Sequence, residues 1–298
     1  MAEPAIRTVA LTKFYGQQRG IEALDLEVNR GEIFGFLGPN GAGKTTTIRL
    51  LLDIIRPTSG RAEVLGMDVG ERSLEVRART GYLPGELALY GYMTGAELLE
   101  YLAALRGVSR DGANEVAARL GLDLTRRIDT LSKGNKQKVG ITQAFLHDPD
   151  LLVLDEPTSG LDPLVQNEFY AMVRDVARRG KTVFLSSHVL SEIEHVAHRV
   201  GIIRAGRLAV VEDIAALKAK AVRRIEFNFA SPPPADAFAA IPGVRDASVE
   251  GSIARFTIDG SVDGLIKAVA RFEVLDVVTD EADLEDIFLE YYEDEDES

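Results

Sequence analysis

The sequence predicts an α/β domain followed by a smaller α+β domain. Residues 151–154 and 182–186 are short apolar segments of the kind that form central parallel strands, and residues 163–179 between them have helical apolar spacing. A glycine-rich turn at 38–43 separates a strand-like segment at 31–37 from a helix expected to begin near Lys44. This alternation of strand and helix is typical of an α/β layout.

A helical insertion is expected within the first domain. Residues 94–145 are dominated by Ala, Leu and Glu, and their apolar spacing is helical throughout. We therefore interpret about 86–145 as an insertion between two strands of the α/β domain.

The distribution of charge predicts a domain boundary near residue 220. The net charge is −13, but residues 1–219 carry 27 Lys+Arg against 28 Asp+Glu, whereas residues 220–298 carry 7 against 19. We therefore assign 1–219 to the first domain and 220–298 to a second domain with an acidic tail. Nucleic acid is not expected as a partner, because phosphate backbones bind basic surfaces.

The second domain is predicted to be ferredoxin-like. Strand-like segments at 223–229, 244–249, 253–258 and 274–278 alternate with helix-like segments at 235–240 and 262–271, and a last helix is expected at 284–292. The order β-α-β-β-α-β is that of the ferredoxin-like fold.

The composition limits the chemistry and the location of the chain. It contains no cysteine, so disulfides, thiol nucleophiles and cysteine-bound metals are excluded. No apolar run reaches the roughly 18 residues that cross a bilayer, and the first residues lack the apolar stretch of a signal peptide. We therefore expect the chain to stay in the cytoplasm.

The turn at 38–45 matches the phosphate-binding pattern G-x-x-x-x-G-K-T. Backbone amides that curl around a phosphate leave little room for Cβ atoms, and the following helix presents its positive end to the anion. Lys44 would neutralise β- and γ-phosphate charge, and the hydroxyl of Thr45 would ligate Mg²⁺. The residues expected to bind ATP here are Gly38, Asn40, Gly41, Ala42, Gly43, Lys44, Thr45 and Thr46.

Two carboxylates follow the apolar segment 151–154. If that strand lies beside the strand that precedes the phosphate loop, Asp155 and Glu156 reach the bound nucleotide. Asp155 would then hold Mg²⁺, directly or through water, and Glu156 would be the general base that activates the attacking water.

Further segments resemble those of ABC proteins. Leu131-Ser132-Lys133-Gly134-Asn135 resembles the ABC signature sequence, in the form found in exporter-type members. The segment 159–162, which ends at Asp162, resembles the loop after the catalytic Glu, and Ser187-His188 resembles the switch histidine. The segment 13–16 contains Tyr15, which matches the aromatic residue that stacks on adenine. These motifs, in the family's order, span residues 6–220.

The resemblance implies a P-loop NTPase fold of the ABC type and a head-to-tail dimer with two sandwiched ATP molecules. The signature and the loop after the catalytic Glu would contact the ATP of the second subunit, through Ser132, Gly134, Asn135 and Asp162. His188 would contact the γ-phosphate. ATP binding would close the dimer, and hydrolysis would reopen it.

The chain departs from the family pattern in two places. Gly85 stands where the family usually has a Mg²⁺-ligating Gln, which leaves open whether Glu86, water or the backbone replaces it. Lys133 and Asn135 replace the Gly and Gln of the common signature, and we expect activity to survive because this form exists in the family.

The resemblance implies a membrane-spanning permease subunit, a second ATPase subunit (a homodimer) and a place on the inner face of the membrane. We interpret the apolar and aromatic segment 87–93 as part of the docking surface for the permease, although it also fits core packing under the insertion. The second domain resembles the accessory domain of drug-exporter ATPases, which favours export. An importer ATPase subunit and a soluble, non-transport ABC protein remain alternatives.

His195 and His198 lie three residues apart on an expected helix near two glutamates, a spacing that occurs in metal sites. No further ligand is evident, so we expect a solvated helix face.

Overall fold

The computed structural model describes residues 3–220, 223–234, 237–238, 241–258 and 261–280. It divides into two compact units, Met1–Glu212 and Asp213–Ser298, which are treated separately below. The boundary expected at 219/220 stays a prediction. Within the described residues, the structure has no helix that combines the length and the apolar character needed to cross a bilayer.

The first unit is built on a six-stranded sheet with the order β10-β9-β3-β8-β7-β6. Strand β3 pairs in parallel with β8 and β9, and β7 pairs in parallel with β6 and β8. The strands are β3 (Ile33–Leu37), β6 (Thr80–Leu83), β7 (Leu151–Asp155), β8 (Thr182–Ser187), β9 (Arg199–Arg204) and β10 (Arg207–Asp213). Every residue of β3, β7 and β8 is buried, which explains why most of their residues are apolar. The α/β prediction is therefore confirmed.

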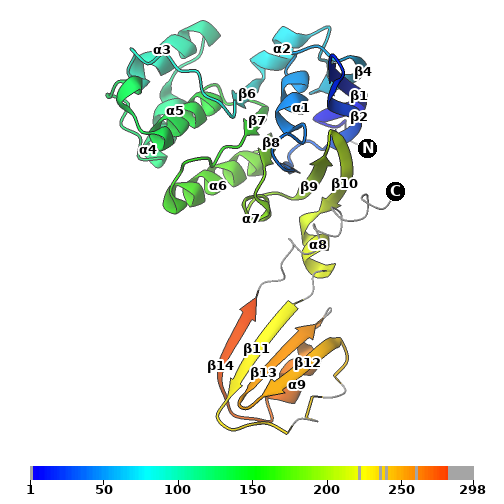
Figure 1. Ribbon diagram of the computed structural model, residues 1–298. Helices are drawn as coiled ribbons and strands as arrows, with labels where there is room; N and C mark the ends of the chain where they lie inside the picture. The colour runs from blue at the N-terminus through cyan, green and yellow to red at the C-terminus, as the bar shows by residue number, and fades with distance from the viewer. Residues whose placement is uncertain (1–2, 221–222, 235–236, 239–240, 259–260, 281–298) are drawn as a thin grey trace. The chain divides into compact units, whose positions relative to one another are not determined.

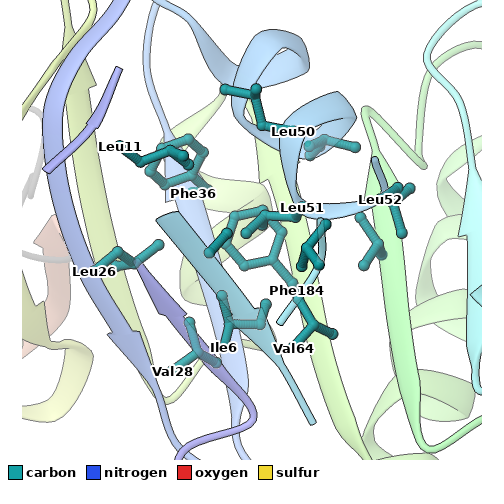
Figure 2. Close-up of a cluster of buried hydrophobic side chains, with 14 of the residues drawn as sticks. Ile6, Leu11, Leu26, Val28, Phe36, Leu50, Leu51, Leu52, Val64 and Phe184 are labelled. Atoms are coloured by element: carbon teal, nitrogen blue, oxygen red, sulfur yellow. The ribbon is translucent and has the colours of Figure 1, made fainter. Parts of the chain in front are cut away.

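A second sheet of this unit is antiparallel, with the order β2-β1-β4-β5. Its strands are β1 (Ile6–Tyr15), β2 (Gln18–Val28), β4 (Ser59–Val64) and β5 (Met67–Asp68). A hydrophobic core lies between the two sheets, and Figure 2 shows Phe36 and Phe184 among the side chains of β1, β2 and the helix that follows β3.

The helices of the first unit include a separate group at one end of it. The helices α3, α4 and α5 lie together, away from β1, β2 and β4 (Figure 1). They fall within the segment expected to be a helical insertion. The helices are α1 (Lys44–Leu51), α2 (Ser73–Ala78), α3 (Gly95–Arg106), α4 (Asp111–Arg119), the 3₁₀ helix η1 (Ile128–Thr130), α5 (Lys133–Phe145), α6 (Pro163–Arg178) and α7 (Leu190–Glu194).

The second unit contains a four-stranded antiparallel sheet with the order β12-β13-β11-β14. Its elements are α8 (Ile214–Lys220), β11 (Arg223–Phe229), β12 (Val244–Glu250), β13 (Ile253–Ile258), α9 (Asp263–Val269) and β14 (Val274–Asp280). This strand order is that of the ferredoxin-like fold. The helix expected at 235–240 lies largely outside the described residues, and the one expected at 284–292 lies entirely outside them.

Candidate functional site

The phosphate-binding loop joins the end of β3 to the start of α1, as predicted. Gly43 has a φ of +113°, and a Cβ there would lie 2.7 Å from a methyl group of Ile21. A Cβ on Gly38 would lie 2.4 Å from the carbonyl oxygen of Ile203. Both positions therefore require glycine, which lets the loop pass close to the neighbouring strands.

Lys44 lies beneath this loop and is almost fully buried. Its Nζ donates hydrogen bonds to the carbonyl oxygens of Gly38, at 2.6 Å, and Pro39, at 3.3 Å. These bonds hold the ammonium group at the start of α1, where the positive end of the helix adds to its charge.

Asp155 ends β7 and is 1% exposed. Its Oδ2 accepts a hydrogen bond from Thr45 Oγ1 at 2.7 Å, and its Oδ1 accepts one from Ser186 Oγ at 2.5 Å. Because β7 and β8 are parallel neighbours, the ends of both strands meet the phosphate loop at one edge of the sheet. Burial and the charge of Asp155 also raise the pKa of the nearby Tyr82 hydroxyl.

Glu156 lies between Lys44 of the phosphate loop and His188. Its Oε1 lies 3.2 Å from Lys44 Nζ, and its Oε2 lies 2.8 Å from His188 Nδ1. Oε1 is buried and accepts no hydrogen bond within the described part of the chain. The residue has a φ of +50°, a left-handed conformation that is uncommon for a non-glycine residue and clusters at functional sites.

The backbone around Glu156 is held by two buried side chains. Its N–H donates to the side-chain Oγ of Ser186 at 3.3 Å and also to the Ser186 carbonyl oxygen at 3.2 Å. Gln137, from α5, donates through Nε2 to the carbonyl oxygens of Glu156, at 3.3 Å, and Pro157, at 3.0 Å. The helix that begins within the candidate signature segment is therefore tied directly to the strand end that carries the candidate base.

A cleft of about 270 Å³ opens beside these groups. The ring of Tyr15 is 47% exposed, with Lys13 Nζ 5.3 Å from its centroid. Gln18, Arg19 and Gly20 also line this cleft, although no motif in the sequence marks them as site residues. The cleft is lined by Tyr15, Gln18, Arg19, Gly20, Pro39, Asn40, Gly41, Gly43, Lys44, Thr45, Thr46 and Glu156.

The candidate signature residues lie at the start of α5. Ser132 caps this helix by accepting a hydrogen bond from the backbone N–H of Asn135 at 3.3 Å, and Asp162 caps α6 by accepting one from the N–H of Val165 at 3.0 Å. A Cβ on Gly134 would lie 2.5 Å from the carbonyl oxygen of Gly160, so the first turn of α5 packs closely against the turn before Asp162. Ser132, Gly134, Asn135 and Asp162 are not among the described residues that line the cleft of their own chain.

Gly85 lies beside the candidate metal site. A Cβ there would lie 3.2 Å from Asp155 Oδ2, whereas Glu86 is exposed. A side chain at position 85 would therefore contact the carboxylate that the sequence assigns to Mg²⁺, but glycine offers no ligand there.

The donor set fits magnesium. Thr45 Oγ1 and Asp155 Oδ2 are hard oxygen atoms at the mouth of a phosphate site, and Mg²⁺ is typically held there by one or two such groups with water and phosphate oxygens. No cluster of three or more His, Cys, Asp or Glu residues suited to a metal occurs in the ranges that the structure describes. The ring Nδ1 of His195 is bonded to the carbonyl of Ser191, and that of His198 accepts from the N–H of Ile33.

The segment 87–93 has two kinds of side chain. Leu89 and Met93 pack against the core of the helical group. Tyr90 and Tyr92 are 50% and 68% exposed, and the ring of Tyr90 also contacts Tyr101 of α3. Core packing and an exposed aromatic surface are therefore both present in this segment.

Comparison with known proteins gives consistent matches. Residues 21–159 match the family model described as "ABC transporter". The chain is 41% identical over 227 residues to the bacitracin transport ATP-binding protein BcrA of Bacillus licheniformis. This alignment covers 75% of this chain and 74% of that protein. It is 37% identical over 213 residues to the Nod factor export ATP-binding protein I of Paraburkholderia xenovorans, which covers 70% of each. A solved structure of the ATP-binding subunit of an ABC transporter superposes with a TM-score of 0.65 at 29% identity, over 72% of this chain and 92% of that one.

Proposed function

Because the chain belongs to the ABC transporter family of ATP-binding proteins, we propose that it is the ATP-hydrolysing subunit of an exporter. It works as a homodimer on the cytoplasmic face of a membrane and drives a separate membrane-spanning permease subunit. The proposal rests on one observation: Lys44, Asp155 and Glu156 lie close together beside a cleft that opens at the phosphate loop.

ATP binds along this cleft. The exposed ring of Tyr15 stacks on adenine, and the backbone amides of the loop surround the β-phosphate. Lys44 neutralises the charge of the β- and γ-phosphates. The ATP-binding residues are Tyr15, Gly38, Asn40, Gly41, Ala42, Gly43, Lys44, Thr45 and Thr46.

Thr45 and Asp155 hold Mg²⁺ together with the nucleotide. When bound, the ion supplies positive charge that offsets the charge on the transferred phosphoryl group. Ser186 fixes the orientation of Asp155 through its hydrogen bond to Oδ1, so that Oδ2 faces the hydroxyl of Thr45.

Glu156 acts as the general base. It accepts a proton from the water whose oxygen attacks the γ-phosphorus, while the bond to the β,γ-bridging oxygen breaks and ADP leaves. His188, which contacts the same carboxylate, binds the γ-phosphate and holds the water's geometry. The bonds from Gln137 keep Glu156 in its left-handed conformation and pointed toward the cleft.

The second half of each site comes from the second subunit. Ser132, Gly134, Asn135 and Asp162 contact the ATP held by the partner, which agrees with their place outside the described lining of their own cleft. ATP binding closes the dimer and hydrolysis opens it, and this cycle is the mechanical output.

The exposed aromatic surface formed by Tyr90, Tyr92 and Tyr101 receives a short apolar helix of the permease. Tyrosines suit such a contact, because each buries a large apolar ring and retains a hydroxyl at the rim. The segment's other face is anchored in the helical group by Leu89 and Met93, so movement of the permease helix is transmitted to that group. Export is favoured over import by relatives named for bacitracin transport and Nod factor export.

Phosphate release tests the proposal. The purified chain should release phosphate from ATP only when Mg²⁺ is present, and Lys44→Ala should abolish both ATP binding and release. Lys181→Ala is the matched control, because Lys181 pairs with Asp148 and Asp150 instead of with site residues. A Lys44→Ala variant that releases phosphate at the parental rate would contradict the assignment.

A further inference from the structure

Glu192, in α7, joins two segments of the site through its carboxylate. Its Oε1 accepts a hydrogen bond from Thr158 Oγ1 at 2.6 Å, and its Oε2 accepts one from Ser187 Oγ at 2.5 Å. Both hydroxyl groups belong to buried residues, and Glu192 itself is half-buried. The carboxylate therefore satisfies two buried donors that lie 29 positions apart in the sequence.

The hydrogen bond between Ser187 and Glu192 helps to fix the position of the backbone that carries His188. Ser187 is the last residue of β8, and its Oγ also accepts a hydrogen bond from the N–H of Val189 at 3.0 Å. Its carbonyl oxygen accepts from the N–H of Gly38, the first glycine of the phosphate loop, at 3.2 Å. The chain is thus held on both sides of His188.

The hydrogen bond between Thr158 and Glu192 helps to fix the turn that leads to Asp162, the residue proposed to contact the ATP of the second subunit. The carbonyl oxygen of Thr158 accepts from the N–H of Leu161 at 3.0 Å, which forms the turn before Asp162. Thr158 also lies two residues after Glu156, whose own carbonyl is held by Gln137. A shift of this turn would therefore move Thr158 and, through Glu192, also Ser187.

We infer that Glu192 is a positioning residue that holds His188 and the turn 158–162 as one unit. This inference rests on the proposed function of His188 and Asp162. When the turn engages the second subunit, the bridge brings His188 to its place over the γ-phosphate of the chain's own ATP. Closure at one site is thereby required for the correct geometry at the other.

The carboxylate is specifically required because both of its partners are hydroxyl donors. Ser187 Oγ already accepts from Val189, so its proton is directed at Glu192. Glutamine has nearly the same shape, but it replaces one acceptor oxygen with a donor NH₂ group and cannot accept from both hydroxyls in the same way.

Steady-state kinetics of Glu192→Gln tests the inference. The kcat for phosphate release should fall about 10- to 100-fold, as expected when a catalytic group is misplaced, while the KM for ATP stays within about twofold. Ser191→Ala is the matched control, because Ser191 is exposed on the same helix. Thr158→Val should reproduce part of the loss, and Thr158→Ser, which keeps the hydroxyl, should restore the parental kcat.

The double variant Glu192→Gln/His188→Ala separates positioning from general stability. If Glu192 acts through His188, its change has no further effect once the imidazole is gone, so the double variant should match His188→Ala. Losses that multiply, or a Glu192→Gln variant with the parental kcat, would overturn the inference alone. A parent chain without ATPase activity, or a His188→Ala variant equal to the parent, would overturn the proposed function and this inference with it.

Discussion

Nδ1 of His188 lies 2.8 Å from Oε2 of Glu156, and the two side chains come from the ends of the neighbouring parallel strands β8 and β7. The contact places a ring that can donate hydrogen bonds beside the carboxylate that would activate water. The strand pairing of the core sheet therefore brings together two residues that are 32 positions apart in the sequence.

The first prediction concerns His188. In His188→Ala the γ-phosphate loses a donor that is fixed by the protein, and phosphate release should fall about 100-fold. Binding of ATP should be retained, because the loop and Lys44 are unchanged. Isothermal titration with ATP and a phosphate assay on the same sample provide both measurements, and a parallel loss of ATP affinity would contradict the assigned role.

The second prediction concerns Gly85. In Gly85→Gln an amide oxygen would extend from a Cβ that lies beside Asp155 Oδ2, and amide oxygens are suitable Mg²⁺ ligands. The Mg²⁺ concentration needed for half-maximal ATP binding should fall several-fold. Gly85→Leu introduces the same Cβ without a ligand and serves as the control. An equal response in both variants would show that position 85 affects the site only by its bulk.

The third prediction concerns Gly134. A Cβ at this position would lie 2.5 Å from the carbonyl oxygen of Gly160, so Gly134→Ala must move the start of α5 away from the turn before Asp162. ATP-dependent dimer formation should weaken about tenfold or more, whereas ATP binding by the monomer should be unchanged. Gly112→Ala in α4 is the control, because its Cβ has room, with the nearest atom 3.9 Å away. Analytical ultracentrifugation with and without ATP measures the difference.

The fourth prediction concerns acid stability and His147. Burial, together with the charge of Arg106, lowers the pKa of His147 to about 4, from about 6.5 in the unfolded chain. Neither ring nitrogen has a hydrogen-bond partner in the described part of the chain. The folded state thus favours the neutral ring, whereas the unfolded chain binds a proton at His147 below about pH 6.5. The contribution of His147 to the free energy of unfolding is therefore complete above pH 6.5 and is lost as the pH falls toward 4.

Urea unfolding at pH 7 and at pH 4.5 tests this effect. In His147→Phe the loss of unfolding free energy between the two pH values should be smaller by about 1–2 kcal/mol than in the parent. His195→Gln is the control, because His195 is exposed. An unchanged loss in His147→Phe would show that other groups account for the acid sensitivity.

The sequence predicts much of the site because its motifs are local. The phosphate loop, Asp155 and Glu156 each occupy one strand end, so a strand and a short pattern were sufficient to place them. Ser186, Gln137 and Glu192 were not assigned roles, because their roles arise from contacts with residues 19 to 34 positions away. Only the folded chain brings these side chains to the backbone and hydroxyl groups that they hold.

The antiparallel sheet was not predicted for a related reason. The pairing of β1 with β2 shifts register several times, and Ala10 and Ala23 have positive φ values. These irregularities interrupt the period-two alternation of buried and exposed residues by which a strand is recognised. The central strands β3, β7 and β8 are buried and mostly apolar, and they are correctly predicted.

The most direct test of the account is the behaviour of Glu156→Gln with ATP and Mg²⁺, measured by size-exclusion chromatography and phosphate release. The account predicts that the variant loses hydrolysis and elutes as an ATP-bound dimer, because the closed sandwich cannot be resolved without the general base. A variant that releases phosphate at the parental rate and remains a monomer would contradict both the role of Glu156 and the head-to-tail mechanism.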